Sequence, residues 1–137
     1  MADKGKTVWR ILLVLYIIGI CILCFGSFSN GPDLGGTLWG IPKDKIGHFC
    51  MFLPFPVLVF GVFDRITVKP WHSVVFIVCT FVAGCVVAAA TEVIQSLTPT
   101  RQCDINDFRA DALALALSCI CVLIYDISKM SKKGGER

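Results

Sequence analysis

Residues 74–97 read VVFIVCTFVAGCVVAAATEVIQSL, an apolar run in which Glu92 is the one charged side chain. The run exceeds the roughly 20 residues that an α-helix needs to cross the hydrocarbon of a bilayer. A carboxylate inside such a helix costs on the order of 2.5–3.5 kcal/mol at the bilayer centre, so it normally faces the protein interior and has a partner. The stretch therefore predicts a membrane helix with a polar site close to its carboxyl end.

Three more apolar runs of similar length cover about residues 8–28, 46–63 and 108–127. Membrane β-strands would alternate in polarity and be about half as long, so helices are predicted. Apolar residues make up 55% of the 137, charged residues 17%, and the mean hydropathy is +0.74. A soluble domain of this size could not bury that much apolar surface. We therefore predict a single all-α domain over residues 1–137, an integral membrane four-helix bundle with a mobile polar tail at residues 128–137.

Two other readings of the sequence are less favoured. The first run is too long for the apolar core of a signal peptide and has no small-residue cleavage site after it, so we expect a retained helix. Of the eight cysteines, only Cys103 lies in a polar loop, and Cys21-x-x-Cys24 has no histidine or second pair nearby. They are expected to pack as small apolar residues, and no cofactor is predicted.

Basic residues are distributed unevenly along the chain. Of the 13 Lys and Arg residues, nine lie in the amino terminus, the second loop and the tail, whereas the first and third loops carry the other four, Lys43, Lys45, Arg101 and Arg109. Because cytoplasmic segments are enriched in Lys and Arg, both termini are predicted to be cytoplasmic and the first and third loops outward-facing. The net charge of +3 is small and confined to ends and loops, which argues against nucleic-acid binding.

Polar residues gather at the outward ends of three predicted helices. Residues three or four apart share a helix face, so each pair can aim both members at the same place. The inner half of the bundle, by contrast, is expected to be apolar. The outward set comprises Lys45 and His48 at the start of the second helix, Glu92 and Gln95 at the end of the third, Arg101, Asp104 and Asp107 in the third loop, and Asp111 in the fourth helix.

Structural roles for the same residues stay open at this stage. Asp104 or Asn106 could cap the fourth helix, and Lys45 at a helix start is a candidate interfacial residue that extends its ammonium to water. His48 could simply donate to a backbone carbonyl, and Glu92 with Asp111 could form a structural ion pair. The hypothesis that every one of these residues has only a structural role is weaker than the hypothesis of one shared polar site.

Two prolines, Pro54 and Pro56, fall in the middle of the second apolar run. Each removes a helical hydrogen bond and favours a kink. Backbone that is not helical is tolerated at membrane depth where neighbours or a cavity satisfy the freed carbonyls. A kink, and space for a cavity below the polar cluster, are therefore expected.

The order of these motifs resembles the VanZ-like family of small bacterial membrane proteins, named for a protein linked to teicoplanin resistance. The resemblance covers about residues 42–121 and implies an envelope-related role in the bacterial cytoplasmic membrane. Asp111 departs from the pattern, in which Asn is usual. The matching residues are Asp44-Lys45-x-x-His48-Phe49, Glu92-x-x-Gln95, Arg101 after Pro99, and Asp107 followed four residues later by Asp111.

Two functional hypotheses and a structural one follow. In the first, an outward polar cleft binds an anionic lipid or a cell-wall-precursor head group, with Lys45 and Arg101 on phosphate, and thereby modulates the envelope or glycopeptide resistance. In the second, a membrane-embedded enzyme acts on a lipid-linked phosphate or glycan, with Glu92 and His48 as candidate acid and base. In the third, the cluster only holds helices together. The predicted ligand-binding set is Lys45, His48, Glu92, Gln95, Arg101, Asp107 and Asp111.

Metals and oligomers receive no assignment from the sequence. Asp104, Asp107 and Asp111, if all helical, would share a face suited to hydrated Mg²⁺ within the enzyme hypothesis, but no metal site is predicted. Membrane lipids are the expected partners, and self-association is left open.

Overall fold

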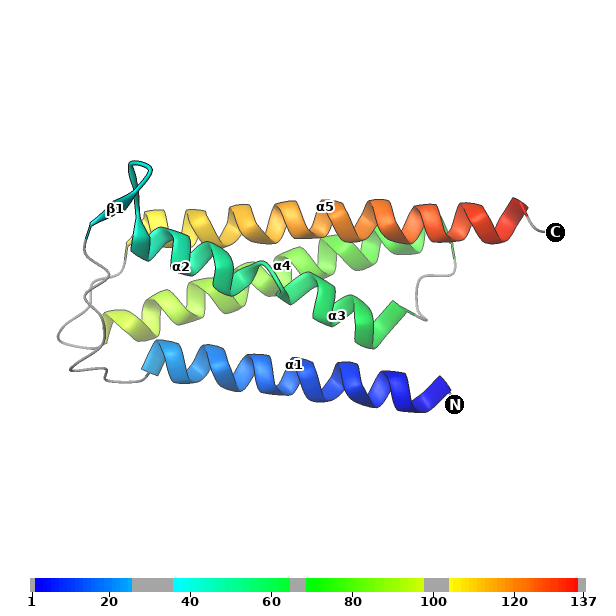
Figure 1. Ribbon diagram of the computed structural model, residues 1–137, viewed down its shortest axis with the longest axis horizontal. Helices are drawn as coiled ribbons and strands as arrows, with labels where there is room; N and C mark the ends of the chain where they lie inside the picture. Colours follow the sequence, from blue (N-terminus) through cyan, green and yellow to red (C-terminus); the bar gives the residue numbers. More distant parts are fainter. Residues whose placement is uncertain (1, 26–35, 65–68, 98–103, 136–137) are drawn as a thin grey trace.

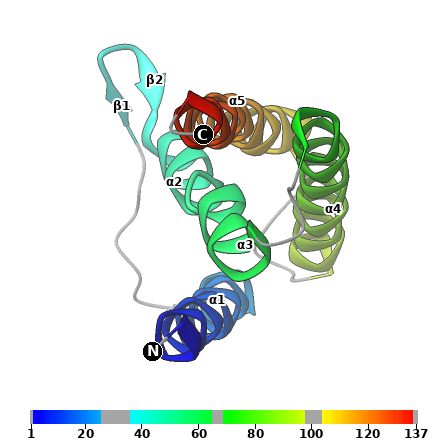
Figure 2. The same cartoon turned by 90° about the vertical axis from the view of Figure 1, so that its right-hand side faces the viewer.

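Helices account for nearly all of the chain that the computed structural model describes, which is residues 2–25, 36–64, 69–97 and 104–135. Within these ranges α2 and α3 follow one another end to end, so the helices form four columns (Figures 1 and 2). Four segments are long and apolar enough to cross a membrane, which confirms the predicted all-α four-helix membrane bundle. The elements are α1 (Ala2–Phe25), β1 (Thr37–Leu38), β2 (Ile41–Pro42), α2 (Lys43–Phe52), α3 (Phe55–Phe63), α4 (Pro70–Ser96) and α5 (Ile105–Gly135).

Helix boundaries extend beyond the apolar runs from which they were predicted. Helix α1 begins at Ala2, α2 begins at Lys43, and α5 continues to Gly135 through residues 128–135. Residues 128–135 of the polar tail are thus helical, and the mobility of the tail stays a prediction. An apolar run needs to be only as long as the hydrocarbon layer is thick. The helix itself can continue beyond that layer through residues that tolerate helical structure, such as Lys, Ser and Met.

The second column is broken where the prolines predicted a kink. Helix α2 ends at Phe52 and α3 begins at Phe55, with Pro54 between them. The hydroxyl of Tyr16 on α1 donates a hydrogen bond of 2.6 Å to the carbonyl of Met51. A side chain of a neighbouring helix therefore donates to a carbonyl beside the break, one of the ways in which prolines are tolerated in membrane helices.

The core lies between α2–α3, α4 and α5. Helix α5 packs along both α4 and α2, while α1 contacts α3 and α4 and exposes most of its described side chains, as expected of a helix facing lipid (Figure 2). Gly84 and Ala88 of α4 are buried against α5, so the small residues there allow a close approach. The main buried cluster is formed by Phe52, Phe55, Ala88, Ala114 and Leu115.

A small hairpin precedes α2 where the sequence predicted only a turn-rich loop. Trp39 and Gly40, between the two strands, have φ of 54° and 82°, the signs that a type I′ turn requires. Trp39 is 92% exposed at the tip. The backbone N–H of Lys43 donates to the carbonyl of Gly36 at 3.3 Å, which ties the hairpin to the first turn of α2.

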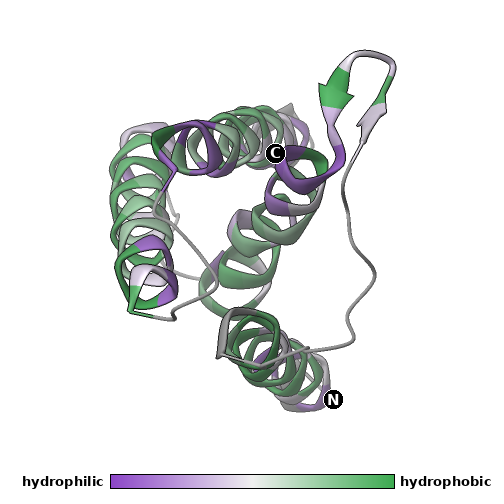
Figure 3. Cartoon of the chain, turned by 90° about the vertical axis from the view of Figure 1, so that its left-hand side faces the viewer, coloured by the Kyte–Doolittle hydropathy of each residue, from purple (hydrophilic) through white to green (hydrophobic). Residues whose placement is uncertain are grey.

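The two ends of the bundle differ in what they hold. Helix α1 starts and α5 ends at one end, while α2 and α5 start and α4 ends at the other (Figure 1). Viewed from this second end, the first turns of α2 and α5 carry hydrophilic residues, and the helices beyond them are mainly hydrophobic (Figure 3). The chain's two ends thus lie on one side of the bundle, and their placement in the cytoplasm stays a prediction.

The end at which the chain starts and finishes is not apolar, contrary to expectation. The hydroxyl of Ser73 on α4 donates to Asp126 on α5 at 2.6 Å, and both residues are buried. Asp64, after α3, binds both Lys6 and Lys129. These pairs join residues of different helices, which periodicity within one helix does not predict.

Candidate functional site

Lys45 and His48 project from the first two turns of α2 toward α5. The ammonium of Lys45 binds Asp104 Oδ2 and Asp107 Oδ1, both at 2.8 Å. Its side chain is one quarter exposed, whereas that of Asp107 is buried. Lys45 is therefore an interhelical ion-pair residue, and not merely a cation reaching for water.

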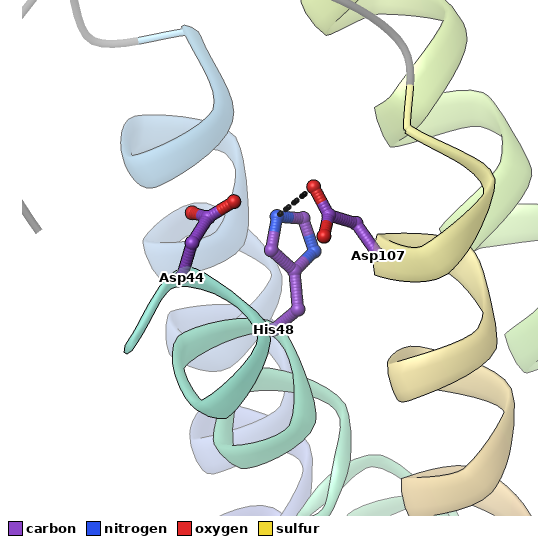
Figure 4. A group of neighbouring side chains, drawn as sticks. All are labelled: Asp44, His48 and Asp107. Carbon is purple, nitrogen blue, oxygen red and sulfur yellow. Dashed lines mark ion pairs between the residues drawn. The ribbon is translucent and has the colours of Figure 1, made fainter. Parts of the chain in front are cut away.

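The imidazole of His48 lies between acids on two helices. Its Nδ1 is 3.3 and 3.4 Å from the two carboxylate oxygens of Asp111 and 3.6 Å from Glu92 Oε1. Its Nε2 is 3.9 Å from Asp107 Oδ2, and Asp44 lies on the other side of the ring from Asp107 (Figure 4). Both ring nitrogens thus face carboxylates, which makes His48 the centre of the cluster.

Glu92 reaches this cluster from α4 and is only 3% exposed. Its Oε2 accepts a hydrogen bond of 3.4 Å from the backbone N–H of Asp104. Its Oε1, and Oδ1 of the fully buried Asp111, receive no hydrogen bond from the described residues. Gln95, one turn after Glu92, is also buried. The prediction that Glu92 faces the protein interior is confirmed.

Asp104 has a structural role and an electrostatic role at once. Its Oδ1 accepts a hydrogen bond of 2.8 Å from the backbone N–H of Asn106, the geometry of an N-cap, so the predicted cap on the fourth helix is confirmed. Its other oxygen binds Lys45. Hydrogen bonds from the Lys45 ammonium and the Asn106 backbone hold the pKa of Asp104 below its ordinary value.

Within the described residues the cluster carries more acid than base. Three buried carboxylates face one ammonium, that of Lys45, and the ring of His48. The structure brings together Lys45, His48, Glu92, Asp107 and Asp111 of the predicted set, and buries Gln95 one turn from Glu92; Arg101 lies outside the described residues. Lys45 is held by acids, so these residues do not form a ready anion pocket on their own.

A groove that the sequence did not reveal runs beside this cluster, between α2 and α5. It encloses about 560 Å³. Arg109 lies at its polar end and donates to Asn106 Oδ1 at 3.3 Å. From the sequence, Arg109 contributed only to the count of Lys and Arg residues that predicts the membrane orientation. Its spacing of four from Leu113 nevertheless predicts that both side chains lie on one helix face. The lining comprises Ile41, Lys45, Ile46, Phe49, Asn106, Arg109, Ala110 and Leu113.

Fold and site together define a polytopic four-helix membrane protein with an acid–histidine cluster buried at one end of the bundle. The family model described as VanZ/LLP1 matches residues 12–126. The chain therefore belongs to the VanZ/LLP1 family, which confirms the resemblance noted from its polar motifs. Neither the curated proteins nor the solved structures provide a match.

Proposed function

We propose that this VanZ/LLP1 protein binds an anionic amphiphile, a lipid or lipid-linked precursor with a phosphate head group, in the groove between α2 and α5. The observation that carries the proposal is the chemistry of the groove, which is cationic at its polar end and apolar along its length. An anionic amphiphile in a membrane matches this arrangement, because its phosphate lies at the interface and its hydrocarbon chain lies below.

Arg109 is the best placed phosphate ligand among the residues that line the groove. A guanidinium has five N–H donors in a planar fork that matches phosphate, and the structure uses one of them on Asn106. Lys45 has three donors, of which two serve Asp104 and Asp107. Its third donor supports a second contact to phosphate. Arg109 thus joins Lys45 and Arg101, the two phosphate ligands that the sequence predicted.

The apolar part of the groove suits a hydrocarbon chain. Ile46 and Phe49 are three apart on α2, and Leu113 faces them from α5. A chain lying there exchanges contact with bulk lipid for contact with protein, so the gain is packing and position and not transfer from water. Selectivity then comes from the head group.

The finer parts of the proposal come from the sequence. Arg101, in the loop before α5, is proposed as a further phosphate ligand. If the first and third loops face outward, the groove opens to the outer leaflet, where a cell-wall-precursor head group is within reach. Binding there would modulate the envelope or its response to glycopeptides.

Binding is favoured over catalysis for one reason. Glu92 and His48, the candidate acid and base, are buried and do not line the groove. A substrate held at Arg109 would reach Lys45 and Asn106 before either of them. The enzyme alternative therefore needs an opening of the bundle that the binding proposal does not.

The test is a head-group comparison on the full chain in nanodiscs. Spin-labelled phosphatidylglycerol and a polyprenyl phosphate are each compared with spin-labelled phosphatidylcholine. We expect the anionic probes to be preferred and Arg109→Gln to lower that preference about tenfold, which is roughly 1.4 kcal/mol. Lys132→Gln, an exposed cation on the last turns of α5, is the matched control and keeps the preference.

Equal binding of the anionic probes by wild type and Arg109→Gln would refute the groove as the site. The Arg101→Gln variant separates the two candidate arginines. Loss of preference there, with Arg109→Gln unaffected, would move the site from the groove to the loop.

A further inference from the structure

We propose that His48, Glu92 and Asp111 form a binding site for one divalent metal ion, held between α2, α4 and α5. The inference does not depend on the lipid groove, whose lining includes none of these three residues. It rests on geometry, burial and charge balance.

The donor atoms are spaced as ligands of one ion. Two ligands each about 2.1 Å from a tetrahedral ion lie about 3.4 Å apart. His48 Nδ1 is 3.3 Å from Asp111 Oδ1 and 3.6 Å from Glu92 Oε1. One donor atom from each of the three residues fits within a 4.8 Å span. A single ion can therefore contact all three with small side-chain adjustments.

Two of these donors have no other use within the described part of the chain. Glu92 Oε1 and Asp111 Oδ1 are inaccessible to solvent, and neither accepts a hydrogen bond from the described residues. The exposed fractions of the Glu92 and Asp111 side chains are 4% and 0%. A buried carboxylate oxygen without a donor is costly, and buried charges are normally paired or bound to metal. A cation at this point would satisfy both oxygens.

Charge balance sets the valence. Lys45 is shared by Asp107 and the partly exposed Asp104, so the carboxylates of Glu92 and Asp111 are left with the neutral or singly charged ring of His48. A divalent ion with two carboxylates and a neutral imidazole has no net charge. This arrangement suits a site buried under a membrane interface, because an uncompensated charge there carries a large desolvation cost.

The far side of the ring has the partner that a metal-bound histidine usually has. A histidine that binds metal through one nitrogen normally donates its other N–H to a carboxylate, which fixes the ring. His48 Nε2 faces Asp107 Oδ2 at 3.9 Å, and Lys45 holds Asp107 in place. A short rotation of the ring would complete this bond.

A second arrangement, with Asp44, His48 and Asp107 around one ion, is weaker (Figure 4). Asp44 is exposed, and Asp107 is already bound to Lys45. In the favoured site of His48, Glu92 and Asp111, one imidazole and two carboxylates suit borderline and hard divalent ions such as Zn²⁺ and Mn²⁺.

The test is metal analysis of the full chain purified in detergent and dialysed in parallel against Zn²⁺ and Mn²⁺. We expect wild type to retain about one more equivalent of one of these ions than Glu92→Gln or Asp111→Asn. All variants keep the eight cysteines, so binding to thiols cancels in the difference. Asp126→Asn is the matched control, because Asp126 is a buried acid on the same helix bound to Ser73, and it should bind as wild type does.

A second measurement covers the case in which a variant does not fold. X-ray absorption on metal-loaded wild type should show nitrogen and oxygen donors at about 2.0–2.2 Å, whereas sulfur donors at about 2.3 Å would overturn the assignment. Equal metal content in wild type and in folded Glu92→Gln would also overturn it. That result would mean that protons or an imidazolium ion compensate the two acids.

Discussion

Leu115 of α5 packs so closely on Gly84 of α4 that a β-carbon at position 84 would lie 2.6 Å from Leu115 Cδ2. Leu115 is fully buried and belongs to the same apolar cluster as Ala88 and Phe52. This contact fixes the separation of α4 and α5 about two turns from Glu92 and one turn from Asp111. The polar cluster therefore depends on the apolar packing directly beneath it.

Replacing Gly84 by alanine should destabilise the bundle. The new methyl group overpacks Leu115, which costs typically about 1–3 kcal/mol, and the helical preference of alanine over glycine returns up to about 1 kcal/mol. We expect a net loss of about 1 kcal/mol in unfolding from mixed micelles. Gly47→Ala, where nothing lies within 4 Å of the added carbon, is the control and should be neutral or stabilising.

Relief by a second substitution identifies the clash as the cause. Gly84→Ala combined with Leu115→Ala should lose less stability than the sum of the two single variants, because the added methyl group no longer meets Leu115. Strict additivity of the two losses would show that the close contact is not what makes glycine necessary.

Removing the Lys45 ammonium should expose how strongly α2 and α5 depend on it. Lys45→Met leaves the buried carboxylate of Asp107 without its cation, and hydrogen bonds to charged groups contribute about 1.5–3 kcal/mol. We expect a loss in this range in the same unfolding assay. Asp107→Asn should then cost less stability in the Lys45→Met background than in the wild-type background. Lys132→Met, on an exposed turn of α5, should stay within about 0.5 kcal/mol of wild type.

The number and kind of membrane helices were predictable because bilayer thickness imposes a length on every apolar run. The clustering of His48, Glu92 and Asp111 was predictable because the order of the helices brings the start of α2, the end of α4 and the start of α5 to one end of the bundle. Spacings of three and four residues then place the paired polar side chains of each helix on one face. The groove was not, because it is made by two helices whose rotation is decided by packing. The Ser73–Asp126 pair was missed for the same reason, since it joins residues of two different helices.

The hydroxyl of Tyr16 should support the break between α2 and α3. Tyr16→Phe keeps the ring and removes the hydrogen bond to the Met51 carbonyl, at an expected cost of about 1 kcal/mol. Tyr125→Phe is the matched control, because the ring of Tyr125 is exposed and packs edge-on against Phe60. An equal effect of both substitutions would show that the Tyr16 bond does not stabilise the break.

Acid should weaken the end of the bundle where the chain starts and finishes through Asp64. Burial tends to raise the pKa of Asp64, but hydrogen bonds from Lys6 and Lys129 outweigh it and leave the pKa below the ordinary value of 3.8. A lowered folded-state pKa means that the contribution of Asp64 is fully present above about pH 3.8 and is lost as pH falls further. Asp64→Asn should be less stable than wild type at pH 7, and the difference should shrink below pH 3.8. A difference that stays constant with pH would refute this linkage.

The orientation predicted from Lys and Arg decides which lipids can reach the groove. Cys103 immediately precedes Asp104 in the sequence, and Asp104 belongs to the polar cluster, so an impermeant maleimide should label Cys103 in intact cells and fail with Cys103→Ser. Thiols within hydrocarbon stay protonated and react poorly, which limits labelling to water-exposed positions. Lys132→Cys in the Cys103→Ser background should react only after permeabilisation, because residue 132 lies at the opposite end of the bundle. The reverse result would place the groove in the cytoplasmic leaflet. Precursors displayed on the outer surface would then be excluded as ligands. An anionic phospholipid of the inner leaflet would still fit Arg109 and the apolar side chains that line the groove.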